Sequence, residues 1–235
     1  MLQRKGEFPM GGRRNLGNYL LAGLGFSLML AALYMVFLYA PTEKHTGVVQ
    51  RIFYFHVPLA WVSFLAFFVV FIGSILYLAK RLEKWDTIAH ASAEVGIVFT
   101  SLVLITGSIW AKSVWGVWWT WDARLTATLV LWFIYTGYLL MRSYVTEEAQ
   151  RARLSAVLGI VGFLDVPIVT LAVMLWRTQH PAPIIFQGGL TPSMLHTLLV
   201  SIAAFTLMYI LLLIQSTSLK SLEADINHLK NRQTE

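Results

Sequence analysis

The sequence predicts an all-α, polytopic membrane protein with six transmembrane helices and both termini in the cytoplasm. Composition is the first reason, because 57% of the 235 residues are apolar and only 13% are charged, whereas soluble domains carry about 25% charged residues. A water-soluble globule of this size could not cover so much apolar surface with so little charge. The second reason is the presence of six apolar runs, and the third is a biased distribution of Lys and Arg, which indicates the orientation of the helices. A disordered chain, a soluble enzyme and a secreted disulfide scaffold are excluded.

Each of the six runs is near the length of about 20 residues that crosses a bilayer core of about 30 Å as a helix. The runs cover residues 18–40, 59–79, 95–111, 125–141, 154–176 and 194–214. The third and fourth are short, and the fifth holds the one charged residue of all six runs, Asp165. The first run is too long for the core of a signal peptide, so we expect a retained signal anchor. We expect a single domain over residues 1–235.

The C-terminal segment, residues 215–235, is polar but carries apolar residues at helical spacing. These residues are Leu219, Leu222, Ile226 and Leu229. The spacing predicts a short amphipathic helix that lies on the membrane surface or against a partner.

The distribution of Lys and Arg orients the six helices. Thirteen of the 18 Lys and Arg residues lie in the N-terminal segment 1–17, in the second and fourth loops and in the tail 215–235. The first, third and fifth loops hold the other five, which are Lys44, Arg51, Lys112, Arg124 and Arg177. Because positive residues concentrate on the cytoplasmic side, we expect loops one, three and five to face outside. The net charge of +6 then reflects this bias, and we expect no nucleic-acid partner.

The third loop, residues 110–124, is the strongest local signal. It contains five of the nine Trp residues within twelve positions, namely Trp110, Trp115, Trp118, Trp119 and Trp121. An interfacial anchor needs one or two Trp at a helix end, so five together favour a binding surface. We expect a short helix along the interface, with Trp115, Trp118 and Asp122 on one face, that offers a flat aromatic shelf to a large apolar ligand.

Four of the six histidines fall on or near the outer face: His45, His56, His180 and His196. His56 and His180 both lie at predicted helix ends on the same side as the Trp-rich loop. Two neutral imidazoles can bind a haem iron from its two faces, so this pair is the candidate metal site. Either His45 or His196 could replace one member of the pair.

Four further charged residues are candidates with two interpretations each. Arg51 and Arg124 could bind the two haem propionates, or lie at headgroup level as surface residues. Asp122 could orient an imidazole or cap the helix that follows it. The intramembrane Asp165 has either a structural role or a role in proton or ligand chemistry.

The sequence contains no cysteine, which excludes disulfides, iron–sulfur clusters and covalent haem attachment through Cys. We find no nucleophile–base set, so no catalytic residue is expected and the chain is not expected to be an enzyme. No Gly-rich phosphate loop is present either, so active transport would require another subunit.

The string WGVWWTWDARLT, residues 115–126, resembles the tryptophan-rich WWD signature of haem-handling proteins in cytochrome c maturation. Over nearly its full length the chain is similar to the cytochrome c maturation protein C family (CcmC, haem exporter protein C). The segments RIFYFHVP, AEVGIVFT, GFLDVPIV and WRTQHP carry the rest of the resemblance.

The resemblance implies that haem b binds at the outer, periplasmic face of the bacterial inner membrane, and plant mitochondria carry relatives. It places the axial ligands at His56 and His180 and haem contacts at the residues of the WWD loop. Those residues are Trp115, Trp118, Trp119, Trp121 and Asp122. The implied partners are a periplasmic haem chaperone (maturation protein E), two ATP-binding cassette subunits (maturation proteins A and B) and a small single-span subunit (maturation protein D).

Two other functions are compatible with the residues alone. A transporter or permease subunit for another small solute is suggested by Asp165 and by the short third and fourth runs. A membrane anchor for a partner complex would use the Trp residues only structurally.

Overall fold

The computed structural model describes residues 11–176, 179–180 and 189–234, and their regular secondary structure is helical apart from one isolated bridge. The elements are α1 (Gly11–Tyr34), the π-helical turn η1 (Met35–Tyr39), the 3₁₀ turn η2 (Val48–Ile52), α2 (Phe53–Lys80), α3 (Glu83–Trp115), α4 (Ala123–Tyr144), α5 (Glu148–Phe163), α6 (Asp165–Leu175) and α7 (Pro192–Thr234). Within the described residues, six helical segments are long and apolar enough to cross a membrane. The predicted fold class and the number of spans are therefore confirmed.

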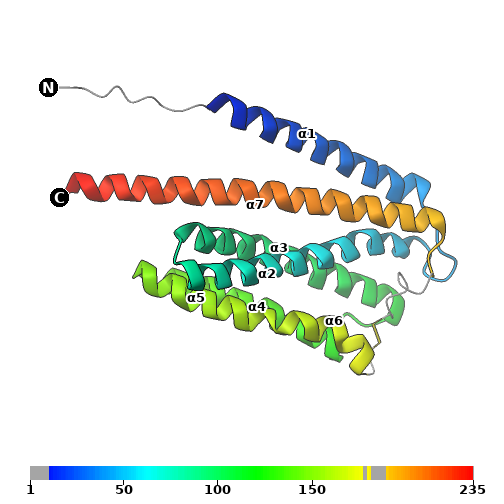
Figure 1. Ribbon diagram of the computed structural model, residues 1–235. Coiled ribbons are helices and arrows are strands. Elements are labelled where there is room, and N and C mark those ends of the chain that lie inside the picture. Colours follow the sequence, from blue (N-terminus) through cyan, green and yellow to red (C-terminus); the bar gives the residue numbers. More distant parts are fainter. Residues whose placement is uncertain (1–10, 177–178, 181–188, 235) are drawn as a thin grey trace.

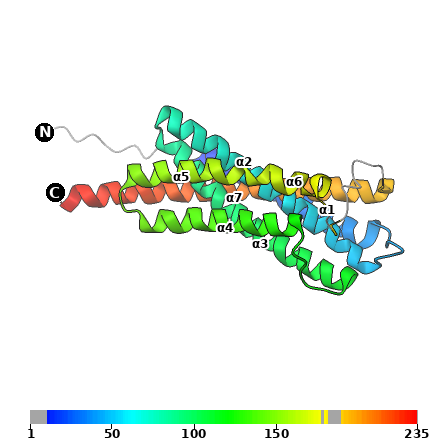
Figure 2. The same ribbon diagram turned by 90° about the horizontal axis from the view of Figure 1, so that it is seen from below.

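The helices run side by side along one common direction (Figure 1). The start of α1 and the end of α7 lie at one end of the bundle, together with the turns that join α2 to α3 and α4 to α5. The α1–α2 and α3–α4 connections lie at the opposite end, where α6 ends and α7 begins (Figures 1 and 2). The loops that the charge distribution assigns to the outside therefore share one end, which we call the loop end.

Helix α2 occupies the middle of the bundle and packs against α3, α5 and α7, whereas α1 packs mainly against α7. The Phe67 ring of α2 stacks on Tyr135 of α4 with centroids 3.8 Å apart. Gly96 lets α3 approach this pair, because a Cβ at that position would come within 2.7 Å of Cε1 of Phe67. Close contact between α2 and α3 matters for the site, because it brings His56 of α2 within hydrogen-bond distance of Thr106 of α3.

Two helices extend furthest beyond their apolar runs. Helix α3 has 33 residues and α7 has 43, which correspond to about 50 and 65 Å at 1.5 Å per residue. The prediction of a separate short helix in the tail was wrong, because α7 continues without a break to Thr234. The segment from Gln215 to Thr234 contains no Gly or Pro to end the helix, and backbone hydrogen bonds continue where the side chains become polar.

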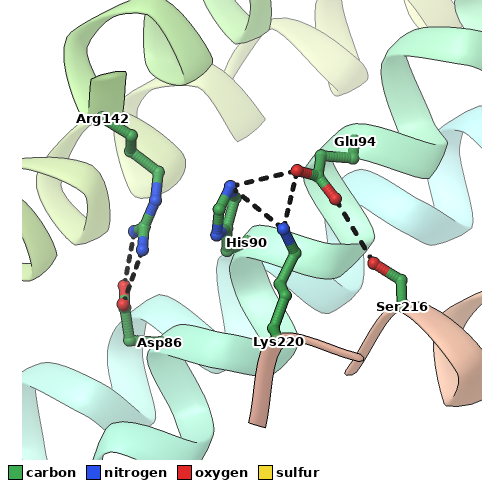
Figure 3. A network of polar contacts seen from close by, with 6 residues as sticks. All are labelled: Asp86, His90, Glu94, Arg142, Ser216 and Lys220. Atoms are coloured by element: carbon green, nitrogen blue, oxygen red, sulfur yellow. Dashed lines mark hydrogen bonds and ion pairs between the residues drawn. The ribbon is translucent and has the colours of Figure 1, made fainter. Parts of the chain in front are cut away.

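The extensions of α3, α4 and α7 are joined by polar side chains at the end of the bundle opposite the loop end. Figure 3 shows the six residues, which are Asp86, His90, Glu94, Arg142, Ser216 and Lys220. The two Nη atoms of Arg142 donate to the two carboxylate oxygens of Asp86 at 2.6 and 2.7 Å. Lys220 Nζ donates to Glu94 Oε1 at 2.7 Å. These pairs tie α4 and α7 to α3 in the part of α3 that precedes its apolar segment, residues 95–111.

The fifth span is interrupted between α5 and α6 at Leu164. Pro167 explains the break, since it lacks an N–H and its ring clashes with the carbonyl of the residue four positions earlier, here Phe163. The interruption places Asp165 at the start of α6, where the residue is 9% exposed. Its Oδ2 has no hydrogen-bond partner within the described parts of the chain. Both interpretations of Asp165, structural and chemical, therefore stay predictions.

Candidate functional site

His56 lies inside α2, one turn after the helix begins at Phe53. The apolar run 59–79 placed His56 before the second span, and this part of the prediction was wrong, because the span covers Val48–Lys80. The 3₁₀ turn η2 leads directly into α2, so the helix starts before the apolar run and Pro58 falls in its second turn. As a result the imidazole stands on a rigid helix, and its Nδ1 lies 2.9 Å from Oγ1 of Thr106 on α3.

The ring of His180 lies beside that of His56, with centroids 6.5 Å apart and planes inclined by 33°. Two imidazole–metal bonds of about 2 Å, plus about 1 Å from each nitrogen to its ring centre, give a centroid separation of about 6 Å. The pair that was predicted from the sequence is thus brought together at the loop end, at a separation that suits one metal centre between two imidazoles.

The two other outer histidines are both exposed. His196 is exposed in the second turn of α7, next to the buried Thr197 and Leu198. His45 is exposed in a turn where Glu43 Oε2 accepts hydrogen bonds from the backbone N–H groups of His45 and Thr46. These two bonds lower the pKa of Glu43 to about 2. The turn therefore presents a fixed negative charge near His45.

The Trp-rich loop does not contain the predicted short helix. Helix α3 ends at Trp115, because Gly116 takes a left-handed conformation with φ of 78°, and no helix is assigned to residues 116–122. Asp122 then caps α4: its Oδ1 accepts from the backbone N–H groups of Arg124 and Leu125 at 3.0 and 3.1 Å. The shared helical face that was predicted for Trp115, Trp118 and Asp122 is therefore absent.

The indole rings of the loop form an angular surface, and the flat shelf predicted from the sequence is not observed. Trp110 meets Trp115 edge to face at 5.2 Å, and Trp119 meets Trp121 in the same way at 5.8 Å. Trp118 and Trp121 are 60% and 76% exposed. The Nε1 atom of Trp119 is buried and has no partner among the described residues. The loop thus offers a broad apolar contact with an unused indole N–H donor.

The candidate charged residues differ in their positions. Arg124 is the second residue of α4, and its charge acts on the imidazole of His56. Arg51 instead has its guanidinium over the ring of Phe37, 5.6 Å from the centroid. Asp122 serves as the helix cap, and its Oδ2 accepts a further hydrogen bond from Thr120 at 3.1 Å. The structure thus associates Arg124 with His56 and places the guanidinium of Arg51 over Phe37.

Comparison with known proteins identifies the family. A sequence model described as "Heme exporter protein C" matches residues 14–232. The chain belongs to the heme exporter protein C family. A protein of that name from Bradyrhizobium diazoefficiens is 40% identical over 176 residues, which are 74% of this chain and 67% of the relative. The protein of that name from Escherichia coli K12 is 34% identical over 170 residues, which cover 72% and 69% of the two chains.

A ccmC-like mitochondrial protein of cytochrome c biosynthesis from Marchantia polymorpha is also 34% identical over 170 residues, which are 72% of each chain. The family match extends over all six spans and most of the extension of α7. The predicted family membership is therefore confirmed for nearly the whole chain, including the loop end with its two histidines.

Thr106 and Gly107, two residues beside His56, were not predicted as site residues from the sequence. Both lie in the third apolar run, which was correctly predicted to be a helix. Thr106 contacts the imidazole through its hydroxyl. A Cβ on Gly107 would come within 3.1 Å of Cε1 of His56. Neither residue belongs to a recognisable motif, and each sits in an apolar run like other small residues. Only the packing of α3 against α2 shows that they touch the site.

Proposed function

We propose that the chain holds haem at the outer face of the membrane and passes it to a partner in cytochrome c maturation. The observation that carries this proposal is the adjacency of His180 to His56, which lies near the start of α2, the helix that begins at the loop end. The names of the relatives, which refer to heme export and cytochrome c biosynthesis, support the choice of ligand.

In this proposal His56 and His180 bind the iron of the haem from opposite sides. The indoles of Trp115, Trp118, Trp119 and Trp121 contact the porphyrin, and Arg124 pairs with a propionate. Haem b brings its own iron and vinyl groups, so these residues bind and orient the cargo and none acts as acid, base or nucleophile. The chain is then a delivery protein and not an enzyme.

The proposed setting is the bacterial inner membrane, with the loop end facing the periplasm. The apolar helices hold the site at that surface, where a periplasmic haem chaperone (maturation protein E) collects the cargo. ATP-binding cassette subunits (maturation proteins A and B) and a small single-span subunit (maturation protein D) are the proposed companions. A mitochondrial relative suggests an equivalent site on the corresponding face of the mitochondrial inner membrane.

An optical spectrum of the purified full-length protein with added haem tests the proposal. We expect the low-spin spectrum of six-coordinate iron, which changes to a high-spin spectrum in His56→Ala and in His180→Ala. In the double variant haem retention should fall at least about tenfold, since both iron bonds are lost. His196→Ala is the matched control, because this exposed histidine lies at the same end of the bundle. A low-spin spectrum that persists in the double variant would refute the assignment.

A further inference from the structure

Thr106 faces His56 across the interface of α2 and α3, and its hydroxyl makes two short contacts. Oγ1 lies 2.7 Å from the carbonyl oxygen of Leu102, one turn earlier in α3. It also lies 2.9 Å from Nδ1 of His56. The hydroxyl owns only one proton, so it can donate to just one of these two atoms.

The proton of Thr106 belongs to the contact with Leu102. If the hydroxyl donated to His56 instead, two oxygen atoms would stand 2.7 Å apart with no proton between them, which is repulsive. Donation to a carbonyl four residues earlier is common for Ser and Thr in helices. Thr100, Ser101 and Ser108 of α3 all donate in this way, at 2.7 to 2.8 Å. Thr106 therefore acts as an acceptor toward the imidazole.

An acceptor at Nδ1 decides the tautomer of the neutral ring. His56 must carry its proton on Nδ1 to donate to Thr106, and Nε2 then keeps a free lone pair. We propose that Thr106 is a positioning residue that holds His56 in the Nδ1–H tautomer, with Nε2 available as an iron ligand. The role toward iron rests on the proposed function, whereas the tautomer of the metal-free protein does not.

The hydrogen bond also restricts the orientation of the imidazole. Gly107 leaves room for the ring edge against α3, since a Cβ there would come within 3.1 Å of Cε1. Thr106 then holds that ring by Nδ1. A histidine that binds metal commonly donates its other ring N–H to a fixed acceptor, and loss of the acceptor costs about 10–100-fold in metal affinity. Thr106 is such an acceptor for the Nδ1–H group of His56.

The first test uses nitrogen NMR of the metal-free, full-length protein labelled with ¹⁵N-histidine. It is recorded well above the ordinary histidine pKa of about 6.5, and the His56 signals are assigned by their loss in His56→Gln. We expect a protonated Nδ1 and an unprotonated Nε2. In Thr106→Val, which keeps the side-chain shape but removes the acceptor, the population should shift toward the Nε2–H form. A wild-type ring protonated on Nε2 would overturn the proposal.

The second test measures haem affinity and the iron reduction potential in three variants. Thr106→Val should lose about tenfold or more in haem affinity and raise the potential, because the imidazole becomes a weaker donor. Thr106→Ser keeps the hydroxyl and should restore both values. Thr100→Val is the matched control, because Thr100 donates to Gly96 in the same helix. Equal affinity and potential in Thr106→Val and the wild type would contradict the role toward iron.

The two proposals fail in different ways. If wild-type haem binding does not depend on His56, the proposed function is wrong, while the NMR result still decides the tautomer. If binding depends on His56 but Thr106→Val changes neither tautomer nor affinity, the inference on Thr106 is wrong and the proposed function stands. Because the wild-type NMR measurement needs no variant at Thr106, a folding defect in Thr106→Val would not prevent a decision.

Discussion

Arg142→Leu is expected to lower the free energy of unfolding of the bundle by about 3 kcal/mol. The Arg142 side chain is only 7% exposed and binds Asp86, itself 18% exposed, through two hydrogen bonds. Removal of the cation leaves a largely buried carboxylate without its partner, and such breaks cost about 3–5 kcal/mol. We take the lower value because Asp86 keeps some access to solvent. Reversible unfolding of the purified protein in mixed micelles measures the change.

The double variant Asp86→Leu/Arg142→Leu is the sharpest control for this prediction. Replacing a buried ion pair by apolar residues of similar size is often neutral, so the double variant should recover most of the lost stability. Lys220→Met should cost less, about 1 kcal/mol or below, because the carboxylate it pairs with, Glu94, is 38% exposed. A double variant as unstable as Arg142→Leu would show that the unpaired charge is not the cause.

These ion pairs show why the number of spans could be predicted while the lengths of the helices could not. Hydropathy detects the residues that meet lipid, and it starts the third run at Val95, directly after the charged Glu94. The helix already begins at Glu83, because Glu94 and Asp86 are satisfied by Lys220 and Arg142 from other helices. Such pairing depends on tertiary contacts that are absent from a local pattern. The break at Leu164 is local, by contrast, and Pro167 is a readable signal for it.

Some features of the candidate site could likewise be predicted from the sequence, and others could not. His56 and His180 could be proposed as a pair from the sequence, because the charge bias places both on one side of the membrane, although His45 and His196 were open alternatives. The Trp-rich loop was given the wrong conformation, because its spacing was interpreted as helical. Gly116 ends α3 inside that segment, and Asp122 starts α4 at its far end. Thr106 carries no sequence signal at all, since its importance arises from the approach of α3 to α2.

Gly107→Leu is expected to reduce haem retention to the level of His56→Ala while the bundle remains folded. A Cβ at this position already comes within 3.1 Å of Cε1 of His56, so the branches of Leu would occupy the space of the imidazole. The ring must then turn away from α3, which breaks its hydrogen bond with Thr106 and moves its nitrogen from the metal position. The haem spectrum and the unfolding transition of the same preparation measure the two effects separately.

Gly137→Leu is the matched control for this substitution. Gly137 is also a glycine within a membrane-spanning helix, α4, but a Cβ there would meet no atom within 4 Å. Both variants gain the same helix propensity and the same apolar volume, so a difference in haem retention must come from what lies next to the glycine. Gly107→Ala should give an intermediate loss, because a single methyl group requires His56 to move by only a few tenths of an ångström. If Gly107→Leu retained haem as Gly137→Leu does, His56 would not need its contact with α3 to bind iron.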